Sequence, residues 1–178
     1  MIIMGSKMNI RKAALSDLPS VAKVQIASNR STYKEIMPVE YLRSLSVASI
    51  AENWNERLFS NNSKEFMYVA QSDKGTVVGF IAARIENSLN SAIAEITSFY
   101  IIKEFQKKGI GRKLLKSAVE YMTEKNIQAV ALWTVEQNPS RHFYEHLGGQ
   151  MAGSRIIDRG GKKLTQVSYL WKDTSALL

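Results

Sequence analysis

Cysteine is missing from this 178-residue sequence, and proline and histidine are scarce, with three and two residues. The lack of cysteine excludes disulfide bonds, thiolate metal sites and a cysteine nucleophile. No apolar run reaches the roughly 20 residues that a membrane-spanning helix needs, so we expect no membrane association. The apolar stretch near the start is too short for a secretion signal, and we interpret residues 1–7 as a disordered leader. These absences favour a cytoplasmic protein.

The charge of the chain is strongly positive and unevenly distributed. The formal net charge is +8 and the sequence pI is about 9.7, which favours an anionic ligand or partner. Segment 103–116 holds six of the 24 basic residues: Lys103, Lys107, Lys108, Arg112, Lys113 and Lys116. A solvated helix face is the plain alternative to an anion site. A nucleic-acid surface needs stacking aromatic residues among the cations, and only Phe105 occurs there, so we expect no nucleic-acid partner.

Apolar periodicity predicts a mixed α/β domain. The segments that read as strands are 8–15, 65–71, 76–86, 92–102, 127–136, 150–158 and 163–172. Helical spacing follows the cap candidates Ser16 and Asp17 and recurs over 39–59, about 112–125 and 139–147. This order predicts one domain, residues 8–173, in which about seven strands form a sheet flanked by about four helices. Residues 174–178 are expected to be a C-terminal tail.

The loop after the fourth predicted strand has the features of an anion site. Gly109 and Gly111 stand where the strand gives way to a helix, so the backbone can approach a ligand closely. The first N–H groups of that helix are unsatisfied, and the helix dipole adds partial positive charge at the same place. Lys107, Lys108 and Arg112 strengthen the site. The ligand that this arrangement favours is a phosphate or a pyrophosphate.

Two nucleotide-binding patterns do not fit this loop. A dinucleotide fingerprint needs a third glycine where Leu114 stands, and a P-loop needs an earlier glycine and a lysine after Gly111. The pattern that remains, Gln106-x-x-Gly109-x-Gly111, resembles the [QR]-x-x-G-x-[GA] signature of the GNAT superfamily of N-acetyltransferases. Residues 138–150, NPSRHFYEHLGGQ, resemble a later motif of that family. The predicted element order also agrees, so the resemblance covers nearly the whole chain.

The resemblance implies a GNAT-type, mostly antiparallel sheet and a binding site for acetyl-CoA. In the family, the signature loop cradles the coenzyme pyrophosphate and the pantetheine arm lies along the preceding strand. The residues expected to bind the coenzyme are Phe99, Tyr100, Ile101, Gln106, Lys107, Lys108, Gly109, Ile110, Gly111, Arg112 and Asn138. Asn138 can also cap the helix that follows it. Arg30 and Tyr33 are expected to line the acceptor pocket by family position alone.

Tyr144 is the first candidate for a chemical role. It stands one position away from the apolar stripe of its predicted helix, so it need not be part of the core. In the family this tyrosine often protonates the thiolate of coenzyme A, which requires a positioned proton donor. The structural alternative is an interfacial tyrosine whose hydroxyl bonds a backbone carbonyl.

Glu95 is the second candidate, as the only acid in the predicted strand 92–102. Strand alternation places it on one face with Thr97, Phe99 and Ile101. The family often has a glutamate here that acts as a general base, directly or through water. The alternative is a glutamate paired with a surface cation. Members of the family usually carry a bulge in this strand, which leaves the later face assignments open.

His142 and His146 are spaced like metal ligands, but no third ligand cluster and no H-E-x-x-H motif accompany them. We therefore expect no metal. No residue is a convincing covalent nucleophile either, which favours direct attack of one substrate on the other in a ternary complex.

The expected function is transfer of an acetyl group from acetyl-CoA to a primary amine of a small molecule, such as a polyamine, an amino acid or an antibiotic-like amine. A polyamine would need a local acidic patch, for which the candidates are Glu35, Glu40, Glu52 and Glu56. Two alternatives stay open: a non-catalytic sensor that binds acyl-CoA, and a protein N-terminal or lysine acetyltransferase. A homodimer is common in the family and is left open for this chain.

Overall fold

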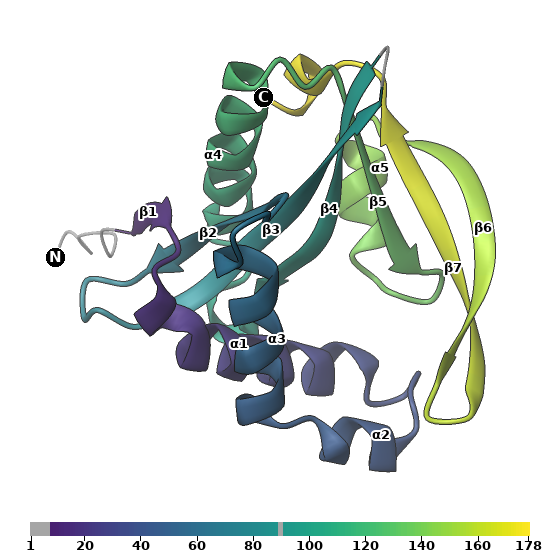
Figure 1. Cartoon of the computed structure of the whole chain (residues 1–178). Coiled ribbons are helices and arrows are strands. Elements are labelled where there is room, and N and C mark those ends of the chain that lie inside the picture. Colours follow the sequence, from purple (N-terminus) through teal and green to yellow (C-terminus); the bar gives the residue numbers. More distant parts are fainter. Residues whose placement is uncertain (1–7, 89–90) are drawn as a thin grey trace, which may run out of the picture.

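A seven-stranded sheet forms the centre of the protein. The computed structural model describes residues 8–88 and 91–178, so the leader expected at 1–7 lies outside the described residues. In this part of the chain the strand order is β1-β2-β3-β4-β5-β7-β6. All neighbouring strands pair antiparallel except β4 and β5, which are parallel. The predicted mixed, mostly antiparallel sheet is confirmed (Figure 1).

The bounds of the elements follow the predicted segments closely. The strands are β1 (Asn9–Lys12), β2 (Glu65–Gln71), β3 (Val77–Ser88), β4 (Ser91–Ile101), β5 (Ala129–Val135), β6 (Gln150–Arg159) and β7 (Lys162–Trp171). The α-helices of the described residues are α1 (Leu18–Tyr33), α2 (Val39–Ser44), α3 (Val47–Phe59), α4 (Ile110–Glu124) and α5 (Arg141–His146). None of these helices has the length and apolar character that crossing a bilayer requires.

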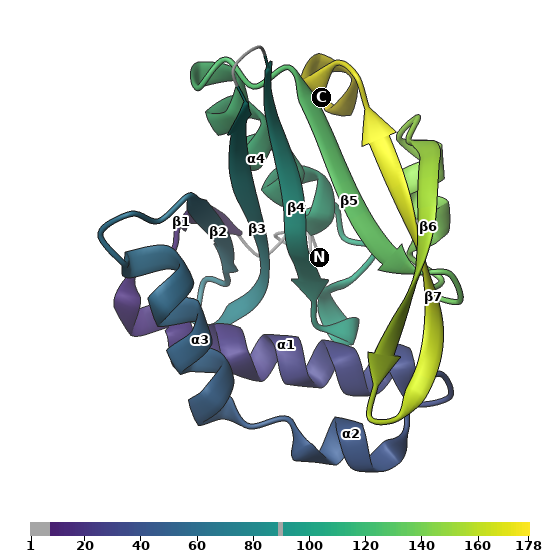
Figure 2. The same cartoon turned by 45° about the vertical axis from the view of Figure 1, so that its right-hand side comes forward.

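Helices cover both faces of the sheet (Figures 1 and 2). On one face, α1 and Trp54 of α3 pack against Phe80 and Ala82 of β3. On the other face, the buried stripe of α4 packs against Ile81 and Ala83 of the same strand. Tyr144 of α5 belongs to the same core. Because β3 presents alternate residues to two cores, it is apolar along its central part.

The region predicted as one helix over 39–59 is two helices. Leu45 is extended, with φ −64° and ψ 121°, and ends α2. The Ser46 hydroxyl then accepts a hydrogen bond from the Ser49 N–H at 3.5 Å and begins α3. The prediction of continuity was wrong because a serine that can cap a helix competes with its continuation.

The last residues pack against the domain instead of extending from it. Thr174–Leu177 form a 3-10 turn, and Leu177 is buried beside α4. The Thr174 hydroxyl donates to the backbone oxygen of Ile127 at 3.1 Å. The segment expected as a C-terminal tail therefore contributes an apolar side chain to the core through Leu177.

Candidate active site

A cavity of about 470 Å³ lies where β4 and β5 separate. The two strands pair from Ile93–Ala129 to Ile96–Leu132, and beyond that point β4 stays beside β3 while β5 stays beside β7. Figure 2 shows the strands diverging towards α1, which runs past their ends. Backbone groups of β4 that face the opening are thereby left available to a ligand.

Most of the predicted site residues meet at this cavity. The lining includes Tyr33, Phe99, Tyr100, Ile101, Gln106, Lys107, Gly109, Gly111, Arg112, Asn138 and Tyr144. Lys108 and Ile110 are not among the lining residues: the Lys108 ammonium lies 5.2 Å from the centre of the Phe105 ring, and the Ile110 side chain is buried in the core. Because its side chain is in the core, Ile110, the first residue of α4, can contact a ligand only through its backbone.

The loop before α4 is shaped by two left-handed residues. Lys107 has φ 58° and Gly109 has φ 77°. The left-handed conformation is uncommon for lysine, and residues held in such uncommon backbone conformations cluster at functional sites. Gln106 anchors the loop by donating from Nε2 to the Ile101 oxygen at 2.9 Å. A Cβ on Gly109 would have no heavy atom within 4 Å, so this side of the loop is open. Left-handed residues in a loop that precedes a helix are a feature of backbone anion-binding sites.

A bulge in β4 changes which residues share a face. Ser98 lies opposite Ala82 and Ile96 lies opposite Ala83, so Thr97 is the extra residue. The bulge precedes Phe99, whose ring packs against Phe143 on the α4 side, 6.1 Å between centroids. Glu95 and Phe99 therefore lie on opposite faces of β4, because each bulge residue shifts the alternation by one. This decides the face assignment that the sequence had left open.

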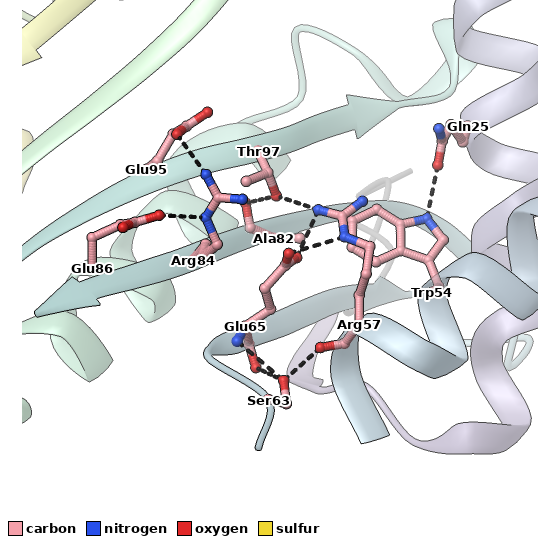
Figure 3. A network of polar contacts seen from close by, with 10 residues as sticks. All are labelled: Gln25, Trp54, Arg57, Ser63, Glu65, Ala82, Arg84, Glu86, Glu95 and Thr97. Atoms are coloured by element: carbon pink, nitrogen blue, oxygen red, sulfur yellow. Dashed lines mark hydrogen bonds and ion pairs between the residues drawn. The ribbon is translucent and has the colours of Figure 1, made fainter. Parts of the chain in front are cut away.

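Glu95 is held in a surface network outside the cavity lining (Figure 3). Its Oε2 lies 3.2 Å from a terminal nitrogen of Arg84, its cross-strand neighbour on β3. Arg84 also pairs with Glu86 through Nε at 2.8 Å. This is the arrangement of a glutamate paired with a cation, one of the two interpretations that the sequence allowed.

The bulge itself is held by Arg57 of α3 (Figure 3). Arg57 donates to Thr97 Oγ1 at 3.1 Å and makes two bonds, of 2.9 and 2.7 Å, to the carboxylate of Glu65. Its guanidinium stacks over Trp54, 4.0 Å from the ring centre. The Trp54 indole N–H in turn donates to Gln25 of α1 at 2.8 Å. One side chain therefore ties α3 and β2 to the wall of the cavity.

Tyr144 is buried and lines the cavity at the same time. Its ring packs against Phe143 and Tyr169, with centroids 5.8 and 6.2 Å away. Burial raises the pKa of Tyr144 above its ordinary value, with a further contribution from Tyr100. The hydroxyl is therefore protonated at neutral pH. The turn after α5 is fixed by Gly149, whose N–H donates to the backbone carbonyl oxygen of Tyr144 at 3.0 Å.

Asn138 joins the two sides of the cavity. Its Nδ2 donates to the Tyr33 hydroxyl at 2.9 Å and to Thr134 Oγ1 at 3.1 Å, and its Oδ1 accepts from the Ser140 N–H at 2.9 Å. Both ends of the amide thus have protein partners, so the side chain serves as a brace as well as a turn cap. Burial raises the pKa of Tyr33 to about 12.

Arg30 does not line the cavity. Its Nε donates to the backbone oxygen of Leu42 at 3.1 Å, which fastens α2 to α1. Lining residues that the sequence interpretation missed include Ser28 and Thr32 of α1 and Thr134 of β5. A signal for the two residues of α1 exists, because the inward stripe of α1 changes from apolar Leu18 and Val21 to polar residues at the same helical spacing.

Sequence and fold are similar to those of known acetyltransferases. The model of the Acetyltransferase (GNAT) family matches residues 28–149. An uncharacterized N-acetyltransferase of Bacillus subtilis (strain 168), YuaI, is 33% identical over 169 residues, 94% of this chain and 95% of that protein. A spermidine N(1)-acetyltransferase of Thermoplasma acidophilum is 28% identical over 131 residues, 72% of this chain and 79% of that protein.

One solved structure with a similar fold was determined in complex with coenzyme A. The PaiA N-acetyltransferase of Thermoplasma acidophilum, solved in complex with coenzyme A, has a TM-score of 0.67 at 24% sequence identity, covering 90% of this chain and 98% of that one. The chain belongs to the GNAT family of N-acetyltransferases.

Proposed function

We propose that the protein transfers the acetyl group of acetyl-CoA to a primary amine of a small molecule, by direct attack in a ternary complex. The observation that carries the proposal is one cavity that joins the glycine loop, the separated strands β4 and β5, and Tyr144. The glycine loop suits the diphosphate of the coenzyme, and the opening between the strands suits its extended pantetheine arm. Tyr144 suits the thioester at the end of that arm.

The residues of the loop suit the diphosphate. Left-handed Lys107 and Gly109 form a concave backbone at the start of α4, and the helix dipole favours negative charge there. Lys107 and Arg112 line the same part of the cavity as cations. The backbone of β4 beyond Ile96 can bond the amide groups of the pantetheine arm as an added strand would.

In the proposed reaction the acceptor nitrogen attacks the thioester carbonyl carbon, a C–N bond forms and the C–S bond breaks. The Tyr144 hydroxyl gives its proton to the departing sulfur and is later reprotonated by water. Burial disfavours the tyrosinate and the thiolate alike, so a raised pKa of Tyr144 does not prevent this transfer. Water rather than Glu95 receives the amine proton, because the Glu95 carboxylate is paired with Arg84 and is not among the lining residues.

Thermal unfolding with acetyl-CoA tests the binding step. A ligand at 100 times its Kd stabilises the folded state by about 2.7 kcal/mol, which raises the unfolding midpoint by several degrees. A Cβ on Gly111 would meet Ile101 at 3.4 Å and Phe99 at 3.6 Å, which is ordinary packing. Gly111→Ala should therefore keep the shift, whereas the larger side chain of Gly111→Val should abolish it.

Thiol release with a panel of amines tests the chemistry. No shift of the wild-type midpoint with acetyl-CoA would overturn the proposal. A shift without thiol release for any amine would assign the chain to the non-catalytic sensors, the alternative that the sequence allowed.

A further inference from the structure

The wall of the cavity that α1 and β5 form is lined by neutral polar groups, and we assign this wall to the acceptor because the glycine loop and β4 are assigned to the coenzyme. They include Ser28, Thr32 and Tyr33 from α1 and Thr134 from β5. Among the described residues that line the cavity there is no carboxylate, and the charged ones are Lys107 and Arg112 at the loop. A polycationic amine would bury its remaining ammonium groups here without a counter-charge, which is unfavourable.

The four glutamates that were candidates for an acidic patch are on the surface. The Glu35 side chain is 83% exposed and that of Glu40 is 78% exposed, and each lies beside a basic neighbour. Glu52 and Glu56 of α3 are exposed as well. With a formal net charge of +8, the protein as a whole also repels polycations.

Ser28 supplies the feature that points to a ligand. It is only 3% exposed, it lines the cavity, and its hydroxyl has no hydrogen-bond partner among the described residues. A serine hydroxyl reorients by rotation about one bond, so it can donate to or accept from a group in the cavity. Thr32 lines the same wall one helical turn further on.

We infer that Ser28 and Thr32 recognise the acceptor, and that the acceptor is a monoamine carrying an uncharged hydroxyl or amide group rather than a polyamine. This inference rests on the proposed function, since it names the amine that the cavity takes. It differs from what the similarity to a spermidine N(1)-acetyltransferase suggests, because overall similarity does not preserve the charge of a pocket.

A matched series of acceptors tests it. Aminobutanol, diaminobutane and butylamine have the same chain length and end in a hydroxyl, an ammonium and a methyl group, and spermidine represents the polyamines. We expect kcat/KM for aminobutanol to exceed that for diaminobutane and spermidine by about tenfold or more. Ser28→Ala should reduce the advantage of aminobutanol over butylamine by about 3- to 10-fold. Ser31→Ala, on an exposed position of α1, should not.

A charge introduced into the lining gives an independent measurement. Thr32→Glu places a carboxylate in the wall, and Thr32→Gln places a neutral side chain of the same size there. Thr32→Glu should shift the preference towards diaminobutane by about tenfold, and Thr32→Gln should not.

The outcomes separate this inference from the proposed function. Preference of the wild type for spermidine or diaminobutane overturns the inference and leaves acetyl transfer intact. Equal effects of Ser28→Ala on aminobutanol and butylamine overturn the role of Ser28. Binding of acetyl-CoA without acetylation of aminobutanol also overturns the inference, whereas failure to bind acetyl-CoA overturns the proposed function itself.

Discussion

Replacing Arg57 by methionine should destabilise the protein strongly. The Arg57 and Glu65 side chains are 30% and 8% exposed, and two hydrogen bonds of 2.9 and 2.7 Å join them. Methionine keeps much of the packing over Trp54 but leaves the Glu65 carboxylate buried without its partner. Breaking a buried pair on one side costs roughly 3–5 kcal/mol. Because Arg57 is partly exposed, we expect the lower limit, about 3 kcal/mol.

Chemical denaturation measures this loss directly, and thermal unfolding should show a midpoint lower by about 6–12 °C. Arg57→Met also removes the donor to Thr97 in the bulge. We therefore expect turnover to fall by a larger factor, relative to wild type, than the thermal stabilisation that acetyl-CoA gives. Adding Glu65→Met should recover most of the lost stability, since no unpaired carboxylate remains. Arg43→Met is the control, because the Arg43–Glu40 pair is 71% and 78% exposed and should contribute little.

A loss below about 1 kcal/mol for Arg57→Met, the range of a surface pair, would refute this reasoning. So would a double variant that is less stable than the single one. Either result would mean that water or another group satisfies the Glu65 carboxylate once Arg57 is gone.

Three further results are expected. Tyr144→Phe should lower turnover by roughly 100-fold or more while the thermal shift with acetyl-CoA persists, and an unchanged rate would remove the tyrosine from the mechanism. Gly149→Ala should cost about 1–3 kcal/mol in urea denaturation, because its Cβ would lie 2.7 Å from the Trp171 ring; wild-type stability would contradict the packing. Burial raises the pKa of Tyr33 from 10.0 to about 12. The contribution of its neutral hydroxyl to the free energy of unfolding is therefore present below pH 10 and is lost as the pH rises towards 12. Tyr33→Phe should make the unfolding free energy less dependent on pH in that window, and an identical pH dependence would count against the assignment.

The helix that follows the glycine loop was predictable from local pattern. It was expected over about 112–125 and lies at Ile110–Glu124. Its buried residues, such as Leu114, Ala118 and Met122, recur at helical spacing, and one glycine stands immediately before it. The residues predicted to bind the coenzyme could be placed together for the same reason, because the loop is contiguous in sequence and most of its residues line one cavity. Their role in binding the coenzyme stays a prediction.

Glu95 illustrates what local pattern cannot supply. Its face depends on the bulge at Thr97, which is a property of the register between β3 and β4. Its partner, Arg84, lies on the neighbouring strand, and alternation alone gives no information on that pairing. The candidates for an acidic patch show the same limit, because the sequence does not tell that the Glu35 and Glu40 side chains are exposed beside basic neighbours.

The amino-acid order alone determined the elements with a strong period, the bare backbone of the loop and the presence of Tyr144 in a short helix. Each of these depends on residues within a few positions of one another, so periodicity and cap residues are sufficient. The opening between β4 and β5 and the neutral wall that α1 and β5 give the cavity were decided only by the tertiary structure. They depend on contacts such as Arg57–Thr97 and Asn138–Tyr33, between residues 40 and 105 positions apart, and only packing of the whole chain brings such residues together.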